Sequence, residues 1–94
     1  GVKIAPEEVE SVVVQHEDVA DCACIPAADA VSGQVPVLCV ALEPGVELDV
    51  AAFRRYLAKA LDASKQPQHI EVVDEVPRTF NGKILRRELI ARFG

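Results

Sequence analysis

The unbroken apolar run VPVLCVAL at residues 35–42 constrains the fold of this 94-residue chain more than any other feature. A strand that is apolar at every position must be covered on both faces, so we expect this run to be the central strand of a sheet between layers of helix. Further short strands are predicted at residues 1–4, 19–25 and 69–76. Pro26 is expected to end the strand that precedes it.

Three helices are predicted between and after these strands. Pro6 can open the first helix, whose apolar spacing continues to about His16. Asp49 is a good N-cap for the second helix. The buried stripe of that helix is predicted to hold Val50, Phe53, Leu57 and Leu61, with Leu48 and Phe53 as a hydrophobic staple. The apolar face of the last helix is predicted to hold Ile84, Leu85, Leu89 and Phe93. The element order β-α-β-β-α-β-α indicates an α+β fold, a single domain over residues 1–94 with a short central sheet flanked by helices.

The charge is distributed unevenly along the chain. Residues 1–77 hold five basic and fourteen acidic side chains, whereas residues 78–94 hold five basic and one acidic side chain. A basic tail on an acidic body fits either an anionic partner or a solvated helix face. The acidic body argues against nucleic acid as that partner. No apolar run approaches the roughly 20 residues of a membrane span, so we expect no membrane-spanning segment.

Three cysteines, Cys22, Cys24 and Cys39, favour free thiols in a reducing compartment, and we expect a cytoplasmic protein. Cys22 and Cys24 are two residues apart and would share one face of a strand. Zinc would need a fourth ligand, and neither His16 nor His69 stands at a familiar ligand spacing. We therefore expect buried structural thiols and no metal site.

The segment PRTFNGKILRREL, residues 77–89, places Lys83 directly after an Asn-Gly pair that can take positive φ angles. A phosphate-binding P-loop is excluded, because Pro77 stands where that motif needs glycine and Ile84 where it needs serine or threonine. A lysine on such a turn could deliver a positive charge to an anionic transition state. It could equally be a surface lysine, and the spacing alone leaves both readings open.

The same segment closely resembles the C-terminal signature of the adenylate-forming enzymes, which include acyl- and aryl-CoA synthetases, peptide-synthetase adenylation domains and luciferases. Residues 1–10 resemble the stretch after the hinge between the two domains of these enzymes, and residues 64–79 resemble the approach to the lysine loop. The resemblance implies the small, mobile C-terminal lid domain, most like that of acyl-/aryl-CoA synthetases. It also implies a missing N-terminal adenylation domain that binds ATP with magnesium and the acid. The isolated domain is therefore expected to be inactive and to bind no cofactor by itself.

The resemblance also implies roles for individual residues. Lys83 matches the catalytic lysine that bridges the substrate carboxylate and the α-phosphate region of ATP. Asn81 and Gly82 would shape its turn, and Thr79 and Arg78 would support it. An acetyltransferase is a possible partner at Lys83, since acetylation would remove the charge.

In the second half-reaction the resemblance implies that the domain rotates and presents another face to the incoming thiol. Gly1 matches the glycine beside the pantetheine tunnel, and Lys3 would approach coenzyme A. The sequence favours coenzyme A as the acceptor. Two alternatives stay open: the pantetheine of a carrier protein as the acceptor, or a free-standing interaction module without catalysis.

Overall fold

A three-stranded mixed sheet forms the centre of the molecule, whose computed structural model describes residues 5–31 and 33–94. Strands β1 (Val19–Asp29) and β2 (Gly33–Leu42) form an antiparallel hairpin, and β3 (His69–Val73) pairs with β2 in parallel. β2 is therefore the central strand, as the apolar run predicted. The strand expected at residues 1–4 lies outside the described residues.

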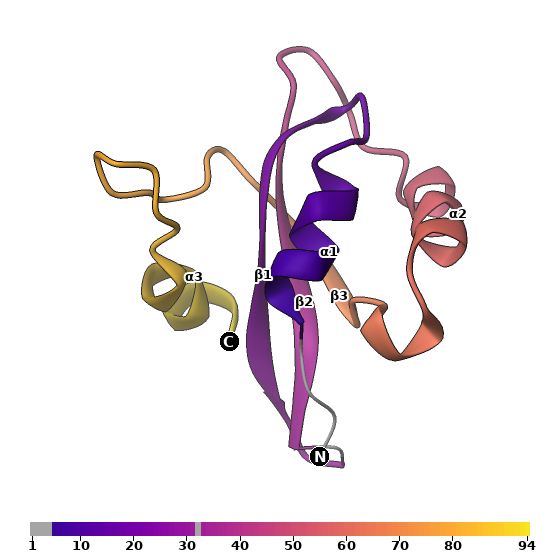
Figure 1. Ribbon diagram of the computed structural model, residues 1–94, viewed down its shortest axis with the longest axis vertical. Coiled ribbons are helices and arrows are strands. Elements are labelled where there is room, and N and C mark those ends of the chain that lie inside the picture. Colours follow the sequence, from indigo (N-terminus) through magenta and orange to yellow (C-terminus); the bar gives the residue numbers. More distant parts are fainter. Residues whose placement is uncertain (1–4, 32) are drawn as a thin grey trace.

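Helices cover both faces of this sheet (Figure 1). Helices α1 (Pro6–Val13) and α2 (Val50–Ala60) lie over one face, and α3 (Arg86–Phe93) lies over the other. A single 3₁₀ turn, Ala63–Lys65, follows α2. This arrangement confirms the α+β class. No helix in the described part of the chain combines the length and apolarity that crossing a membrane requires.

The alternation of side chains between the two faces of β2 explains why residues 35–42 are all apolar. Leu38 and Val40 belong to the core on the side of α1 and α2, whereas Val37, Cys39 and Ala41 belong to the core on the side of α3. All five side chains are buried. Successive side chains of a strand point to opposite faces, so both sets must be apolar when both faces are covered.

Pro26 does not end β1, and this prediction was wrong. The strand continues through Pro26 to Asp29 and stays paired with β2. β1 is an edge strand, and the backbone of Cys24 bonds to side chains outside the sheet rather than to β2. Pro26 is two residues further along, so its nitrogen also points away from β2 and no ladder hydrogen bond is lost. The strand predicted at residues 69–76 is shorter than expected and ends at Val73.

The three predicted helices are present, but several details of the predictions were wrong. The first helix ends at Val13 instead of continuing to about His16. Asp49 caps α2, with its Oδ1 accepting a hydrogen bond from the backbone nitrogen of Ala52 at 3.1 Å. Phe53 and Leu57 are buried as predicted, but Val50 is half exposed and lies outside the buried stripe. In the last helix, Leu89 is fully buried. Ile84 and Leu85 both precede the first helical residue, Arg86, instead of forming part of the helix, and Ile84 pairs with Arg78 in a β-bridge.

Candidate functional site

The lysine turn, residues 78–84, is a tight hairpin that connects the sheet to α3. Arg78 and Ile84 pair across it as an antiparallel bridge. The Thr79 nitrogen donates to the Lys83 oxygen at 2.9 Å, and the Gly82 nitrogen donates to the Thr79 oxygen at 2.9 Å. This is the pattern of a three-residue hairpin loop that needs a left-handed residue at its last position. Gly82 supplies that residue with φ of +91°, whereas Asn81 keeps a negative φ.

Side chains within the turn reinforce its backbone. The Thr79 hydroxyl donates a hydrogen bond to Oδ1 of Asn81, and its oxygen accepts one from the backbone nitrogen of Lys83 at 3.1 Å. Thr79, Asn81 and Gly82 were the residues expected to shape the loop. The structure brings all three together around Lys83.

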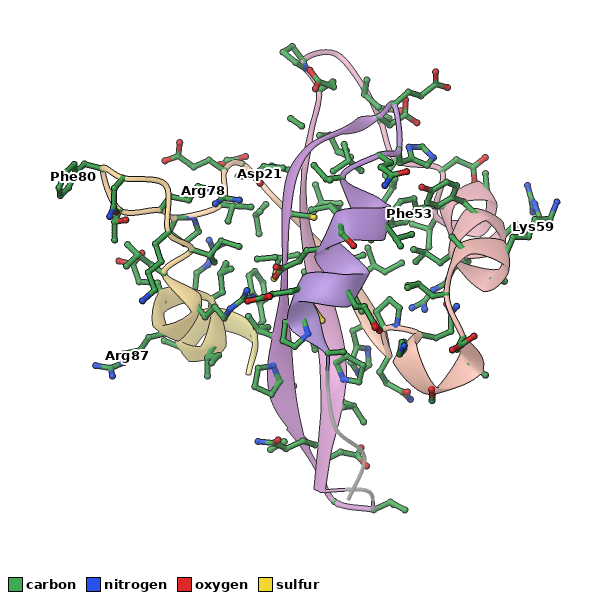
Figure 2. All side chains as sticks on the ribbon, viewed as in Figure 1. Asp21, Phe53, Lys59, Arg78, Phe80 and Arg87 are labelled. Atoms are coloured by element: carbon green, nitrogen blue, oxygen red, sulfur yellow. The ribbon has the colours of Figure 1, made fainter. Side chains whose placement is uncertain are left out.

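Lys83 is exposed on this turn. No carboxylate within residues 5–31 and 33–94 lies within ion-pair distance of its ammonium group. Phe80, at the tip of the same turn, is fully exposed and projects away from the sheet (Figure 2). The turn therefore presents an unpaired cation and an aromatic ring on a backbone that is held by its own hydrogen bonds.

Arg78 ties the lysine turn to the edge of the sheet. Its Nε and Nη2 donate to the two carboxylate oxygens of Asp21 on β1, at 2.8 and 2.7 Å. Its Nη1 donates to the carbonyl oxygen of Gly82 at 2.5 Å. The hydrogen bonds from Arg78 hold the pKa of the Asp21 carboxyl below its ordinary value. Asp21 was not among the predicted site residues, and its 57-residue separation from Arg78 leaves no local signal of the contact.

A second arginine fastens the start of α3 to the same edge strand. Arg86 donates to Glu10 on α1, from Nη1 to Oε2 at 2.5 Å and from Nη2 to Oε1 at 3.0 Å. Arg86 Nη1 also donates to the Cys24 oxygen at 2.8 Å, and the Cys24 nitrogen donates to Glu10 Oε2 at 2.7 Å. Arg86 therefore fits neither an anionic partner nor a fully solvated helix face, because its charge compensates a carboxylate with only 13% of its side chain exposed.

The basic tail is thus partly neutralised within the fold. Arg78 and Arg86 are paired with carboxylates, and Arg92 lies over the ring of Phe93, with 4.8 Å between its guanidinium carbon and the ring centroid. Arg87 projects away from α3 (Figure 2) and, like Lys83, has no ion pair in the described part of the chain.

The three cysteines are free and buried, as predicted. Cys22 and Cys24 share the face of β1 that meets α1, and Cys39 lies on the opposite face of the sheet. Burial raises the pKa of Cys22 and of Cys24 to about 12, and that of Cys39 to about 11. Thiols in this state are poor nucleophiles at neutral pH. No cluster of side chains suited to a metal ion occurs in the described ranges, residues 5–31 and 33–94.

Gly1 and Lys3, the residues expected to approach coenzyme A, lie outside the described residues. Their roles stay predictions. The described part of the predicted site is therefore the lysine turn alone.

Comparison with known proteins identifies one family over most of the chain. The family model of the AMP-binding enzyme C-terminal domain matches residues 8–83. This match runs from α1 through the whole sheet to the candidate lysine itself.

Two similar proteins are plant and nematode ligases. The chain is 36% identical over 93 residues to 4-coumarate–CoA ligase-like 9 of Oryza sativa subsp. japonica, a match that covers 99% of this chain and 17% of that protein. It is 38% identical over 92 residues to acyl-CoA synthetase 7 of Caenorhabditis elegans, covering 97% of this chain and 17% of that protein. The chain thus spans less than one fifth of the length of these relatives.

A solved structure shares the fold. The anthranilate CoA ligase AuaEII, crystallised with anthranoyl-AMP, superimposes with a TM-score of 0.85 at 32% identity. The superposition covers 95% of this chain and 18% of that ligase.

Proposed function

Because the chain belongs to the family of AMP-binding enzyme C-terminal domains, we propose that it is the small domain of an ATP-dependent ligase that joins a carboxylic acid to coenzyme A. The observation that carries the proposal is that CoA ligases match nearly the whole of this chain while extending far beyond it. The remaining part of the enzyme would be the large domain that binds ATP and the acid.

Lys83 is the residue through which this domain would act in the first half-reaction. An acid oxygen attacks the α-phosphorus of ATP, the bond to the pyrophosphate oxygen breaks, and an acyl-adenylate forms. Two anions must approach each other in this step, so a cation between them lowers the barrier. Lys83 suits this role because its ammonium is exposed and unpaired within residues 5–31 and 33–94, on a turn with fixed backbone hydrogen bonds.

In the second half-reaction the thiol of coenzyme A attacks the acyl-adenylate carbonyl and AMP leaves. Lys83 has no role in this step, so the small domain would withdraw it by rotating against the large domain. Gly1 and Lys3 would then lie on the face that meets the thiol, with Gly1 allowing close approach of the backbone.

The test is to replace Lys83 by alanine in the complete ligase and to measure the two half-reactions separately. Acid-dependent ATP–pyrophosphate exchange reports adenylation, and thioester formation from a supplied acyl-adenylate reports the second step. We expect exchange to fall on the order of 10²–10³-fold while thioester formation is retained. Lys59→Ala is the control, since Lys59 is exposed on α2, across the sheet from the lysine turn (Figure 2). Exchange that matches the control would refute the role of Lys83.

We also propose that acetylation of Lys83 would regulate such an enzyme. Acetylation removes the positive charge and leaves the turn without its cation. Treatment with an acetyltransferase and acetyl-CoA should suppress exchange in proportion to the acetylated fraction of Lys83, measured by mass spectrometry. Full activity at stoichiometric acetylation would disprove this mode of regulation.

A further inference from the structure

We propose that Asp21 is a positioning residue for the adenylation lysine and that it acts through Arg78 on the backbone of the lysine turn. This inference rests on the proposed function, because it assumes that Lys83 serves adenylation. It assigns a role to a residue of β1 that is far from the lysine signature in sequence.

The Arg78 guanidinium contacts Asp21 on β1 and Gly82 in the lysine turn at the same time. Nε and Nη2 hold the carboxylate of Asp21, while Nη1 reaches the carbonyl oxygen of Gly82. A guanidinium is planar and rigid, so a carboxylate that binds two of its nitrogens also fixes the direction of the third. Asp21 therefore determines where Arg78 Nη1 points.

The peptide unit between Gly82 and Lys83 is held on both sides as a result. Its carbonyl oxygen accepts from Arg78, and its N–H group, which belongs to Lys83, donates to the Thr79 hydroxyl at 3.1 Å. Because a peptide unit is planar, fixing both groups fixes the orientation of the unit and the starting direction of the Lys83 side chain.

Few other contacts hold the lysine turn against the sheet. In residues 5–31 and 33–94, the bonds from Arg78 to Asp21 are the only hydrogen bonds that join residues 78–84 to the sheet. Phe80, Asn81, Gly82 and Lys83 are all exposed. Apolar packing against the sheet is confined to Ile84, at the end of the turn. Without Asp21, the turn would keep its internal shape and the packing of Ile84, but it would lose the hydrogen bonds that fix Arg78 relative to β1.

The experiment uses the complete ligase and a double-mutant cycle of Asp21→Asn and Arg78→Ala. Asp21→Asn keeps the size of the side chain and an oxygen for the Cys22 nitrogen, which Asp21 Oδ1 accepts from at 2.9 Å. It removes the charge and one of the two acceptors that orient Arg78. We expect ATP–pyrophosphate exchange to fall between about ten- and a hundredfold, the range for small displacements of a catalytic group. Thioester formation from supplied acyl-adenylate should be unchanged.

Asp74→Asn is the matched control, because it removes the same charge from an exposed residue shortly before the lysine turn. If Asp21 acts through Arg78, the double variant will be no slower than Arg78→Ala alone. The proposal is overturned if the losses of exchange in the two single variants multiply in the double variant. It is also overturned if Asp21→Asn slows both half-reactions equally, or if its exchange rate equals that of the control. Lys83→Ala keeps the two questions apart: if it abolishes exchange while Asp21→Asn does not affect it, the proposed function stands and the role of Asp21 falls.

Discussion

Glu10 is predicted to be one of the most important polar residues for the stability of this chain. Its carboxylate on α1 accepts two hydrogen bonds from Arg86 and one from the backbone nitrogen of Cys24. It therefore joins three elements, the first helix, the edge strand and the last helix. Glu10→Ala removes all three bonds at once.

The size of the effect follows from what the substitution leaves behind. The Cys24 nitrogen would lose its acceptor and the Arg86 guanidinium would keep only the Cys24 oxygen, in a place where the Glu10 side chain was only 13% exposed. A hydrogen bond to a charged group contributes about 1.5–3 kcal/mol, and an unpaired buried group costs a similar amount. Arg86 is 31% exposed, so water can replace part of the loss. We expect a loss of about 2–4 kcal/mol, a large share of the roughly 5–15 kcal/mol that stabilises a typical domain.

Urea unfolding followed by circular dichroism measures this loss as a lower midpoint at unchanged slope. Glu8→Ala is the matched control on the same helix. Glu8 pairs with Lys65, but its side chain is 56% exposed, and we expect a loss of about 0–1 kcal/mol. If the two variants unfold at the same urea concentration, the reasoning from burial and hydrogen bonding is refuted.

Three further predictions concern the turn, the thiols and the pH dependence. Gly82→Ala should lower the free energy of unfolding in urea by about 1–2 kcal/mol, because alanine is strained at the φ of +91° although nothing lies within 4 Å of the added Cβ. An unchanged urea midpoint would show that the turn relaxes without cost. Cys22, Cys24 and Cys39 should react with a thiol reagent at pH 8 only after denaturation, because burial raises their pKa values to about 12, 12 and 11; a fast reaction in the native chain would contradict this. The hydrogen bonds from Arg78 lower the folded-state pKa of Asp21, so the stability that wild type holds over Asp21→Asn should be complete well above pH 3.8 and decrease as the pH falls through that lower pKa; a difference in urea midpoints that does not change as the pH is lowered would disprove it.

The sequence predicts the centre of the fold well because local patterns determine it. The run at residues 35–42 favours a strand covered on both faces, and β2 is that strand. The cap at Asp49 is also local, because its side chain accepts a hydrogen bond from the nitrogen of Ala52, three residues later. The two-residue spacing of Cys22 and Cys24 likewise fixes their shared face.

The contacts that position the candidate site could not be predicted in this way. Asp21 and Arg78 are 57 residues apart, and Glu10 and Arg86 are 76 residues apart. Neither pair follows a helical or strand period, and each forms only because the fold brings α1, the lysine turn and the start of α3 to the outer edge of β1. Pro26 was misjudged for the same reason, since only the topology shows that β1 is an edge strand.

These contacts give the uneven charge of the chain a structural explanation. Carboxylates from the acidic body, Asp21 and Glu10, meet guanidinium groups from the basic tail along β1. Together they cover the outer edge of β1 with charged side chains, which discourages pairing with another strand. They also neutralise two positive charges of the tail, which leaves Lys83, Arg87 and Arg92 without an ion pair in the described residues. Among these three, Lys83 is the one on a turn held by its own hydrogen bonds, and a fixed backbone under an unpaired cation is what positioning a catalytic charge requires.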